Sequence, residues 1–201
     1  MDNDSFELHG FEHHEHPIRV TLTNDITQQQ LLDFPAFKTW QNTLKSSLAS
    51  QYKDPEHTFK ENPYTLRSVT VQSVDYFGDS KKAPPKVGFV KIHADIRNSN
   101  SYLPGIAFLR GGSVAMLMIL RPSDSKTERV VVMTEQARIP AGSLRFLEIP
   151  AGMIDRGTFV GAAAKEIKEE TGLEVKEEEL IDLTQLALAE AGVSENLQQA
   201  M

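Results

Sequence analysis

The chain has 201 residues and a mass of 22.4 kDa, and its 40% hydrophobic and 24% charged residues are typical of one or two small globular domains. Its 28 acidic and 21 basic residues give a net charge of −7, which argues against a protein that holds nucleic acid by bulk electrostatics. Cysteine is absent, which excludes disulfides, thiolate nucleophiles and Cys-ligated metals, and no apolar run reaches the roughly 18 residues of a membrane span.

The first 17 residues are acidic and rich in histidine, and they lack the apolar segment of a secretory signal. We therefore expect residues 1–17 to form a flexible tail on a cytoplasmic protein. A second interpretation stays open, because a histidine cluster can bind a transition metal. The histidines concerned are His9, His13, His14 and His16.

A helical pattern begins near Asp33, a residue suited to the N-cap region, and Pro35 suits a first helical turn. Four large apolar residues then recur at spacings of three and four: Phe37, Trp40, Leu44 and Leu48. This spacing places them on one face of a helix, which we expect to pack in a core or an interface.

Two strand-like runs follow, at residues 66–77 and 87–96. The first is rich in Val and Thr, and the second alternates strictly between apolar and polar positions from Val90 to Ile96. With the preceding helix they predict an N-terminal α+β subdomain over residues 18–100. A unit this small has strand edges and an apolar face that need cover, and a homodimer would provide it.

Residues 101–201 have a different pattern. Nearly continuous apolar runs at 106–109, 114–120 and 130–134 predict strands that are buried on both faces, and 146–149 predicts a further strand. Residues 159–171 predict a helix, with Thr158 as N-cap and Gly172 as a left-handed C-cap.

The helix sequence KEIKEE brings three carboxylates, Glu166, Glu169 and Glu170, to one side of the helix. Like charges on one side repel each other, and either solvent or divalent cations can offset this repulsion. Carboxylate clusters suit Mg²⁺ or Mn²⁺, which also bind water and phosphate oxygens. A solvated helix face without a ligand is the alternative interpretation.

The segment PAGMIDRGTFVGAAAKEIKEETGL resembles the Nudix box, G-x5-E-x7-R-E-U-x-E-E-x-G-U, in which U is a bulky apolar residue. Gly152 matches the first glycine, and residues 165–173 match the second half, with Lys165 in place of the arginine. The sequence departs from the box in two ways. The segment from Gly152 to Lys165 is one residue shorter, and Thr158 stands in place of the early glutamate.

The flanking segments QSVDYFG, VGFVKIHADI, LPGIAFLRGGSVAMLMIL and VVMTEQARIPAGSLRFLEIPAGMID extend the resemblance over roughly residues 35–190. They are similar to ADP-sugar diphosphatases, the Nudix branch of plants and fungi that includes ADP-ribose and ADP-glucose pyrophosphatases. The resemblance implies an α+β fold of the α/β/α sandwich type with a mixed sheet, preceded by a dimerisation subdomain.

The resemblance also implies metal-dependent hydrolysis of the pyrophosphate bond of ADP-ribose or ADP-glucose, giving AMP and a sugar phosphate, with Mg²⁺ or Mn²⁺ as cofactor. The metal ligands and catalytic carboxylates would be Glu166, Glu169 and Glu170, with the Ala151 carbonyl as a further ligand. The substrate-binding candidates are Arg138, Arg110 and Glu135.

Several alternatives stay open. Arg138 is otherwise a structural ion-pair partner of Glu135 or Glu148, and Arg110 is otherwise a surface residue at a strand end. Members of the family continue with a further acidic loop, strands and a helix, so we expect this chain to lack the C-terminal part and to be poorly stable. The alternative function is therefore an impaired Nudix-like domain that binds nucleotide sugars or pairs with a full-length subunit. A purely structural acidic domain is the third interpretation.

Overall fold

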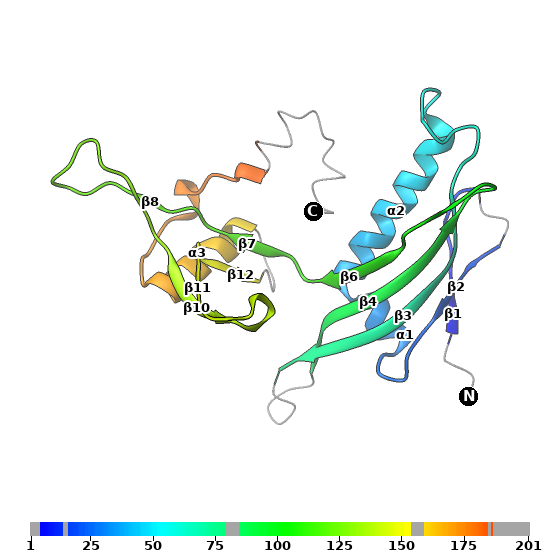
Figure 1. Ribbon diagram of the computed structural model, residues 1–201, viewed down its shortest axis with the longest axis horizontal. Helices are drawn as coiled ribbons and strands as arrows, with labels where there is room; N and C mark the ends of the chain where they lie inside the picture. The colour runs from blue at the N-terminus through cyan, green and yellow to red at the C-terminus, as the bar shows by residue number, and fades with distance from the viewer. Residues whose placement is uncertain (1–4, 14–15, 79–84, 154–158, 185, 187–201) are drawn as a thin grey trace. The chain divides into compact units, whose positions relative to one another are not determined.

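The computed structural model describes residues 5–13, 16–78, 85–153 and 159–184, together with residue 186 (Figure 1). The chain divides into two compact units, residues 1–110 and residues 111–191, which are described separately below. Each unit has its own hydrophobic cluster. Within the described ranges, no helix is both long and apolar enough to cross a membrane.

The first unit is built on a six-stranded mixed sheet. Its strands are β1 (Ser5–Leu8), β2 (Ile18–Thr21), β3 (Thr65–Phe77), β4 (Lys86–Arg97), β5 (Tyr102–Leu103) and β6 (Ile106–Arg110). The order is β1-β2-β3-β4-β5, and β6 also pairs with β4. The β2–β3 pair is parallel, whereas the other pairs are antiparallel. The long strands β3 and β4 therefore form the centre of this sheet.

Two consecutive helices, α1 (Gln28–Asp33) and α2 (Pro35–Lys53), connect β2 to β3. Thr27 caps α1 through a capping box, in which its side chain accepts the Gln30 N–H while the Gln30 side chain accepts the Thr27 N–H. Pro35 occupies the first turn of α2, as predicted. Asp33 ends α1 and does not cap α2, because Phe34 takes the cap position between the two helices.

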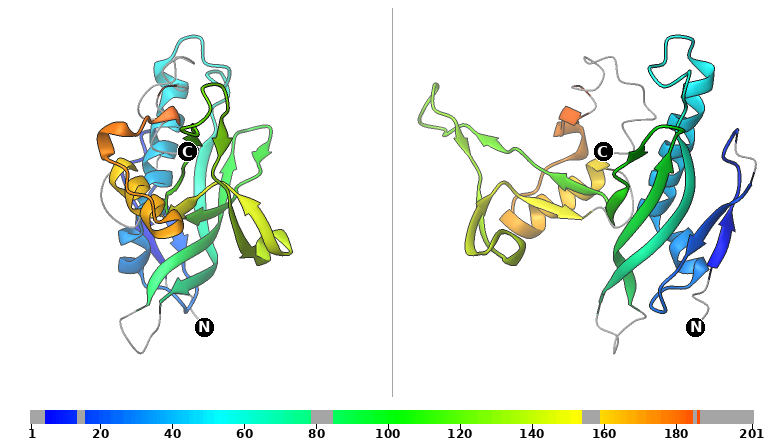
Figure 2. Two further views of the ribbon diagram at one scale, coloured as in Figure 1. Left: turned by 90° about the vertical axis from the view of Figure 1, so that its left-hand side faces the viewer. Right: turned by 45° about the vertical axis from the view of Figure 1, so that its right-hand side comes forward.

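The core of the first unit lies between α2 and one face of the sheet, as the views in Figures 1 and 2 show. Phe37 and Leu48 of α2 are buried, and Trp40 and Leu44 pack against the same cluster, which confirms the predicted helix face. From the sheet, the alternation predicted for β4 is also confirmed, because Val90 and Ile92 are fully buried. The buried residues of this cluster are Leu8, Phe11, Ile18, Val20, Leu22, Ile26, Leu31, Phe34, Phe37, Leu48, Tyr64, Leu66, Val69, Val71, Val90, Ile92, Ala94 and Leu109.

The first unit extends further in both directions than the range 18–100 expected from the sequence. Residues 5–8 form β1, and both Leu8 and Phe11 are buried, so this part of the expected tail belongs to the core. At the other end, β6 pairs with residues 89–93 of β4, which brings residues up to Arg110 into the same sheet. The backbone pairing of these short strands is long-range, and the local sequence pattern does not indicate it.

The second unit contains three separate antiparallel strand pairs. They are β7 (Ser113–Ala115) with β12 (Ala151–Met153), β8 (Ile119–Leu120) with β9 (Val130–Val131), and β10 (Thr134–Arg138) with β11 (Ser143–Glu148). Among its described residues, the unit also contains the helix α3 (Phe159–Thr171) and the short 3-10 helices Ile139–Ala141 and Glu177–Glu179. The α+β class is confirmed, but the described residues of this unit form neither the expected mixed sheet nor a helix–sheet–helix sandwich.

The cluster of the second unit is small, with Val114, Met116, Ala163 and Ile167 as its buried members. The predicted burial of the apolar runs on both faces is wrong. Ile106, Leu117 and Ile119 are 65%, 51% and 55% exposed. The reason is that, in the part of the chain that the structure describes, short strand pairs such as β8–β9 and an edge strand such as β6 lack a neighbouring strand on one side, which leaves their apolar side chains open to water.

Candidate active site

Strand β12 and helix α3 form the structural frame of the candidate site, and both rest on β7. Gly152 lies opposite Val114 in the β12–β7 pair, and the Met116 N–H donates to the Pro150 carbonyl at 2.8 Å. From the helix, Ile167 is fully buried in the cluster that contains Val114. The backbone that carries the first glycine of the motif and the helix that carries its glutamates are therefore anchored to the same strand.

The helix α3 ends as the sequence predicts. Gly172 has a φ of 73°, and its N–H donates to the Lys168 carbonyl at 3.0 Å. This left-handed conformation is one that glycine adopts without the steric cost of a Cβ atom. The predicted N-cap, Thr158, lies outside the described residues.

All three motif glutamates lie on α3, in the register that the sequence predicts. The side chains of Glu166 and Glu170 lie outside the described part of the structure. Glu169 is exposed, and its carboxylate is 3.7 Å from the Lys165 ammonium, one helical turn earlier. A surface pair of this kind contributes little, about 0.3–0.5 kcal/mol. Lys165, which replaces the arginine of the motif, thus contacts a motif glutamate.

The donor chemistry of this set fits a hard divalent cation. Three carboxylates and a backbone carbonyl offer oxygen ligands, which Mg²⁺ and Mn²⁺ prefer. Ala151, the expected carbonyl ligand, pairs with Ala115 of β7 and is partly exposed. Among the residues with described side chains, no three His, Asp or Glu residues gather closely enough to hold a metal ion.

Arg138 lies at the end of β10 and pairs with Glu148 at the end of β11. Its Nε donates to Glu148 Oε1 at 2.6 Å, and its Nη2 contacts the same oxygen. The two side chains are 38% and 20% exposed. Of the two partners that the sequence left open for an ion pair, the structure selects Glu148.

Glu135, the other carboxylate considered as a partner, pairs with Arg145. Arg145 Nε and Nη2 donate to the two carboxylate oxygens of Glu135, each at 3.0 Å. The Glu135 carboxylate raises the pKa of Arg145 through these hydrogen bonds. The structure therefore does not bring Glu135 and Arg138 together in one ion pair.

Arg110 ends β6 in the first unit, where it lies opposite Phe89 of β4 and is exposed. It is thus part of the sheet of the first unit, whereas the other candidate site residues belong to the second unit. Its role in substrate binding stays a prediction.

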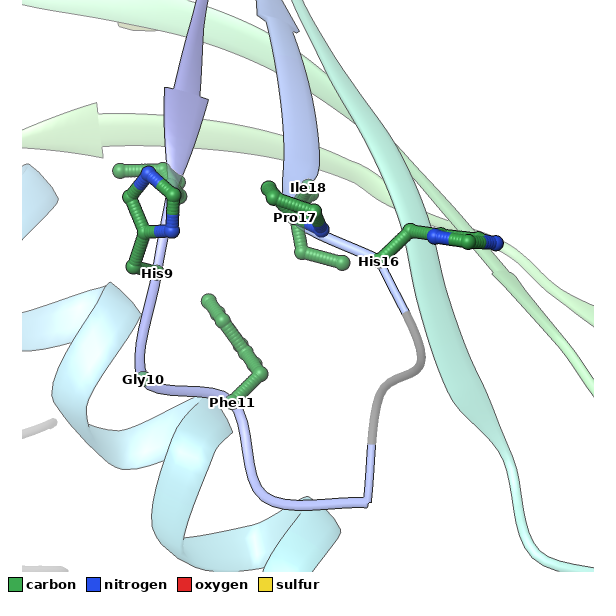
Figure 3. Close-up of a pocket in the computed structure, with 7 residues that line it drawn as sticks. His9, Gly10, Phe11, His16, Pro17 and Ile18 are labelled. Carbon is green, nitrogen blue, oxygen red and sulfur yellow. The ribbon is translucent and has the colours of Figure 1, made fainter.

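His9 and His16 lie at the two sides of the connection between β1 and β2 (Figure 3). His9 and His16 line a pocket there, but the His16 ring points away from His9. His13 stacks on Tyr52 of α2 with ring centroids 3.9 Å apart, and the neighbouring Glu12 pairs with Lys53 at 2.9 Å. The described histidines therefore do not assemble a metal site, and His13 helps to hold this turn against α2. His14 lies outside the described residues.

Sequence reasoning identifies Glu148 only as an ion-pair alternative. Alternate residues of a strand share a face, so the positions of the two glutamates along their strands decide which face each one occupies. Glu148 and Glu135 point to opposite faces of the hairpin, since Glu135 lies opposite Leu147, the neighbour of Glu148. The register of the hairpin is therefore what separates the two glutamates.

Comparison with known proteins shows that the chain is similar to Nudix proteins. A NUDIX domain model matches residues 111–198. The chain is 36% identical over 175 residues to Nudix hydrolase 14, chloroplastic, of Arabidopsis thaliana. This aligned segment covers 84% of this chain and 51% of that protein. It is 56% identical over 43 residues to a Caenorhabditis elegans protein that also carries the name of a nudix hydrolase, covering 21% of this chain and 19% of that protein.

None of the solved structures matches the chain. The chain spans about half the length of the Arabidopsis relative. The match to the family model begins at the residue where the second structural unit begins, Gly111. Residues 111–198 of this chain therefore match the NUDIX domain model, and the chain is similar to a Nudix hydrolase over most of its length.

Proposed function

We propose that the protein is a metal-dependent Nudix hydrolase that cleaves the pyrophosphate bond of ADP-sugars, ADP-ribose or ADP-glucose, to AMP and a sugar phosphate. One observation carries this proposal. The sequence KEIKEET forms the last turns of α3, the next described element after β12, inside the segment that matches the NUDIX model. The three glutamates are therefore in the register of a Nudix box on an anchored helix.

In the proposed reaction, the oxygen of a water molecule attacks one phosphorus of the pyrophosphate, and the bond from that phosphorus to the bridging oxygen breaks. Glu166, Glu169 and Glu170 would hold Mg²⁺ or Mn²⁺ together with the Ala151 carbonyl. The bound cation would stabilise negative charge on the phosphate oxygens and lower the pKa of water. Arg138 would contact a substrate phosphate through its guanidinium group, whose planar fork suits that contact.

A homodimer formed by the first unit is part of the proposal. The sheet face of β4 and β6 that carries Phe89 and Phe108 is aromatic, with ring centroids 5.0 Å apart, and Phe77 lies 4.9 Å from Phe89. Phe108 and Ile106 are 58% and 65% exposed. Apolar side chains that are grouped on a sheet face favour association. Phe108→Glu should therefore yield a monomer in light scattering, whereas Lys60→Glu, in an exposed turn of the same unit, should not.

The proposal includes no binding of nucleic acid, because the acidic net charge of the chain would repel its phosphates.

The proposed location is cytoplasmic. Fluorescence microscopy of the tagged full chain tests this location, and accumulation in another compartment would contradict it.

The test of the activity is phosphate release from a panel of nucleotide sugars with Mg²⁺, after coupling to a phosphatase. We expect release from ADP-ribose or ADP-glucose, and its loss when Mg²⁺ is chelated. Glu170→Gln should weaken metal binding markedly in calorimetric titration, whereas Glu178→Gln, at an exposed position later in the chain, should not. Equal metal affinity of both variants would contradict the assignment of the metal site.

A second candidate function is a domain that binds nucleotide sugars without efficient hydrolysis, or that pairs with a full-length subunit. Two observations favour it. Thr158 stands where the motif has its early glutamate, and the segment to Lys165 is one residue short. In this case the chain would bind ADP-ribose in titration and release no phosphate. Turnover of ADP-ribose would exclude it.

A further inference from the structure

The hairpin β10–β11 carries two Arg–Glu pairs on opposite faces. Glu135 lies opposite Leu147, so Glu135 and Leu147 share a face with Arg145, two residues before Leu147. Glu148 is the neighbour of Leu147 and therefore points to the other face, where it meets Arg138. The two pairs are thus separated by the backbone of the hairpin, and each can be changed without removing the other.

The two pairs also differ in their exposure to water. The Arg138 and Glu148 side chains are 38% and 20% exposed, whereas Arg145 and Glu135 are 80% and 43% exposed. Water screens the interaction of charges, so the less exposed pair holds its geometry more strongly. The more exposed pair is a suitable comparison because it has the same chemistry on the same hairpin.

We infer that Glu148 is a positioning residue that orients the Arg138 guanidinium toward a phosphate of the nucleotide-sugar substrate, an inference that rests on the proposed function. Arg138 Nε and Nη2 both contact Glu148 Oε1, and two contacts to one oxygen fix the plane of the guanidinium. Recognition of a phosphate by arginine depends on this plane, because the N–H groups leave it in a rigid fork.

The position of Glu148 in the chain supports this role. Glu148 ends β11, and Ala151, the expected carbonyl ligand of the metal, begins β12 three residues later. Pro150, between them, is fully buried, and its carbonyl accepts the Met116 N–H. The short, anchored connection ties the Arg138 contact to the backbone beside the candidate metal site.

The experiment measures the affinity of the full chain for ADP-ribose by calorimetric titration in EDTA, which prevents metal-dependent turnover. Arg138→Lys and Glu148→Gln should each weaken binding by about tenfold, because each removes the charge-assisted fork. The double variant should lose little more, since both changes act through one contact. Arg145→Gln, which breaks the pair on the opposite face, should bind as the wild type does.

A charge swap separates positioning from a purely structural role. Arg138→Glu combined with Glu148→Arg should restore the melting temperature lost in the single variants, but not the affinity for ADP-ribose. Recovery of affinity by the swap, or wild-type affinity in Glu148→Gln, would overturn the inference while the proposed function stands. A wild-type chain that neither binds nor hydrolyses ADP-ribose would overturn the proposed function and the inference together.

Discussion

The two units differ in how their strands find partners. In the first unit, β4 pairs with β3 on one side and with β5 and β6 on the other, and α2 covers one face of the sheet. In the second unit, the described strands form three pairs that do not join into one sheet. Each strand of a two-stranded pair has one edge that is not hydrogen-bonded to another strand of a sheet, and such pairs are only marginally stable by themselves.

The exposed apolar side chains follow the same division. Among the described residues, the first unit exposes six large ones: Phe59, Phe77, Tyr102, Leu103, Ile106 and Phe108. The second, smaller unit exposes more: Leu117, Ile119, Leu120, Val130, Val131, Met133, Ile139, Leu144, Phe146, Leu147, Leu173, Ile181, Leu183 and Leu186. An apolar sequence is therefore not sufficient to bury a strand. Burial also requires a neighbouring strand at each edge and a helix over one face. We expect the stability of the chain to be concentrated in the first unit.

The largest expected effect is in the core of the first unit. Ile92 is fully buried in a cluster with eighteen buried members, so Ile92→Ala should leave a cavity that cannot collapse. The free energy of unfolding should fall by about 4 kcal/mol. Urea denaturation followed by the fluorescence of Trp40, the only tryptophan, measures this. Gln72→Ala, at an exposed position of β3 in the same sheet, is the control and should change stability by about 0.5 kcal/mol or less.

The same substitution in the second unit should have a smaller effect. Ile167 is also fully buried, but its cluster has four buried members among the described residues and can relax around the gap, so Ile167→Ala should cost about 2 kcal/mol. Hydrogen exchange of the α3 amides should report this loss, while the Trp40 transition stays in place. An equal shift of the Trp40 transition would mean that the two units unfold as one, and the comparison would fail.

A smaller effect is expected at the start of α1 in the first unit. Thr27→Ala removes the side-chain oxygen that accepts the Gln30 N–H, and it should cost about 1 kcal/mol of unfolding free energy. The Trp40 transition in urea measures this change. Thr58→Ala, in an exposed turn of the same unit, should leave the midpoint unchanged. Equal midpoints for the two variants would show that the capping box does not stabilise the unit.

The smallest effect concerns pH and the turn between β1 and β2. The hydrogen bond and charge of Lys53 lower the pKa of Glu12 below its ordinary value of 4.5. A carboxyl group with a lowered folded-state pKa stabilises the fold above its unfolded pKa, and loses this contribution as the pH falls through the folded pKa. The stability difference between wild type and Glu12→Gln should thus be constant above about pH 5.5 and shrink below pH 4.5. A pH-independent difference in urea midpoints would contradict this.

The sequence predicts the regular elements of the first unit well, because their signals are local. The spacing of Phe37 and Leu48 indicates α2, and the alternation around Val90 and Ile92 indicates β4. The strand β1 does not follow from the sequence, since four residues in a polar segment carry too little pattern, and only pairing with β2 makes them a strand. The runs at 114–120 and 130–134 are less buried than their apolar content predicts, because burial also requires a covering layer.

The candidate site is also predictable only where its signals are local in the sequence. The register of Glu166, Glu169 and Glu170 follows from helical spacing alone, and the left-handed Gly172 follows from its place after the helix. The partner of Arg138 does not follow from local sequence. It depends on the hairpin register, which shifts between Gln136 and Arg138. A bulge of this kind redirects side chains, and no residue near it signals the shift.

The parallel pairing of β2 with β3 also has a consequence for the order in which the chain folds. Arg19 pairs with Ser68, 49 residues later, whereas β3 and β4 are joined by a short connection. Closing a long loop carries an entropic cost that a nearby hairpin avoids, and contacts distant in sequence slow folding. We expect the β3–β4 hairpin and α2 to form first, and β2, with β1 attached, to dock last. On the ribosome, the segment that is synthesised first would thus complete its sheet only after residues 65–77 have emerged.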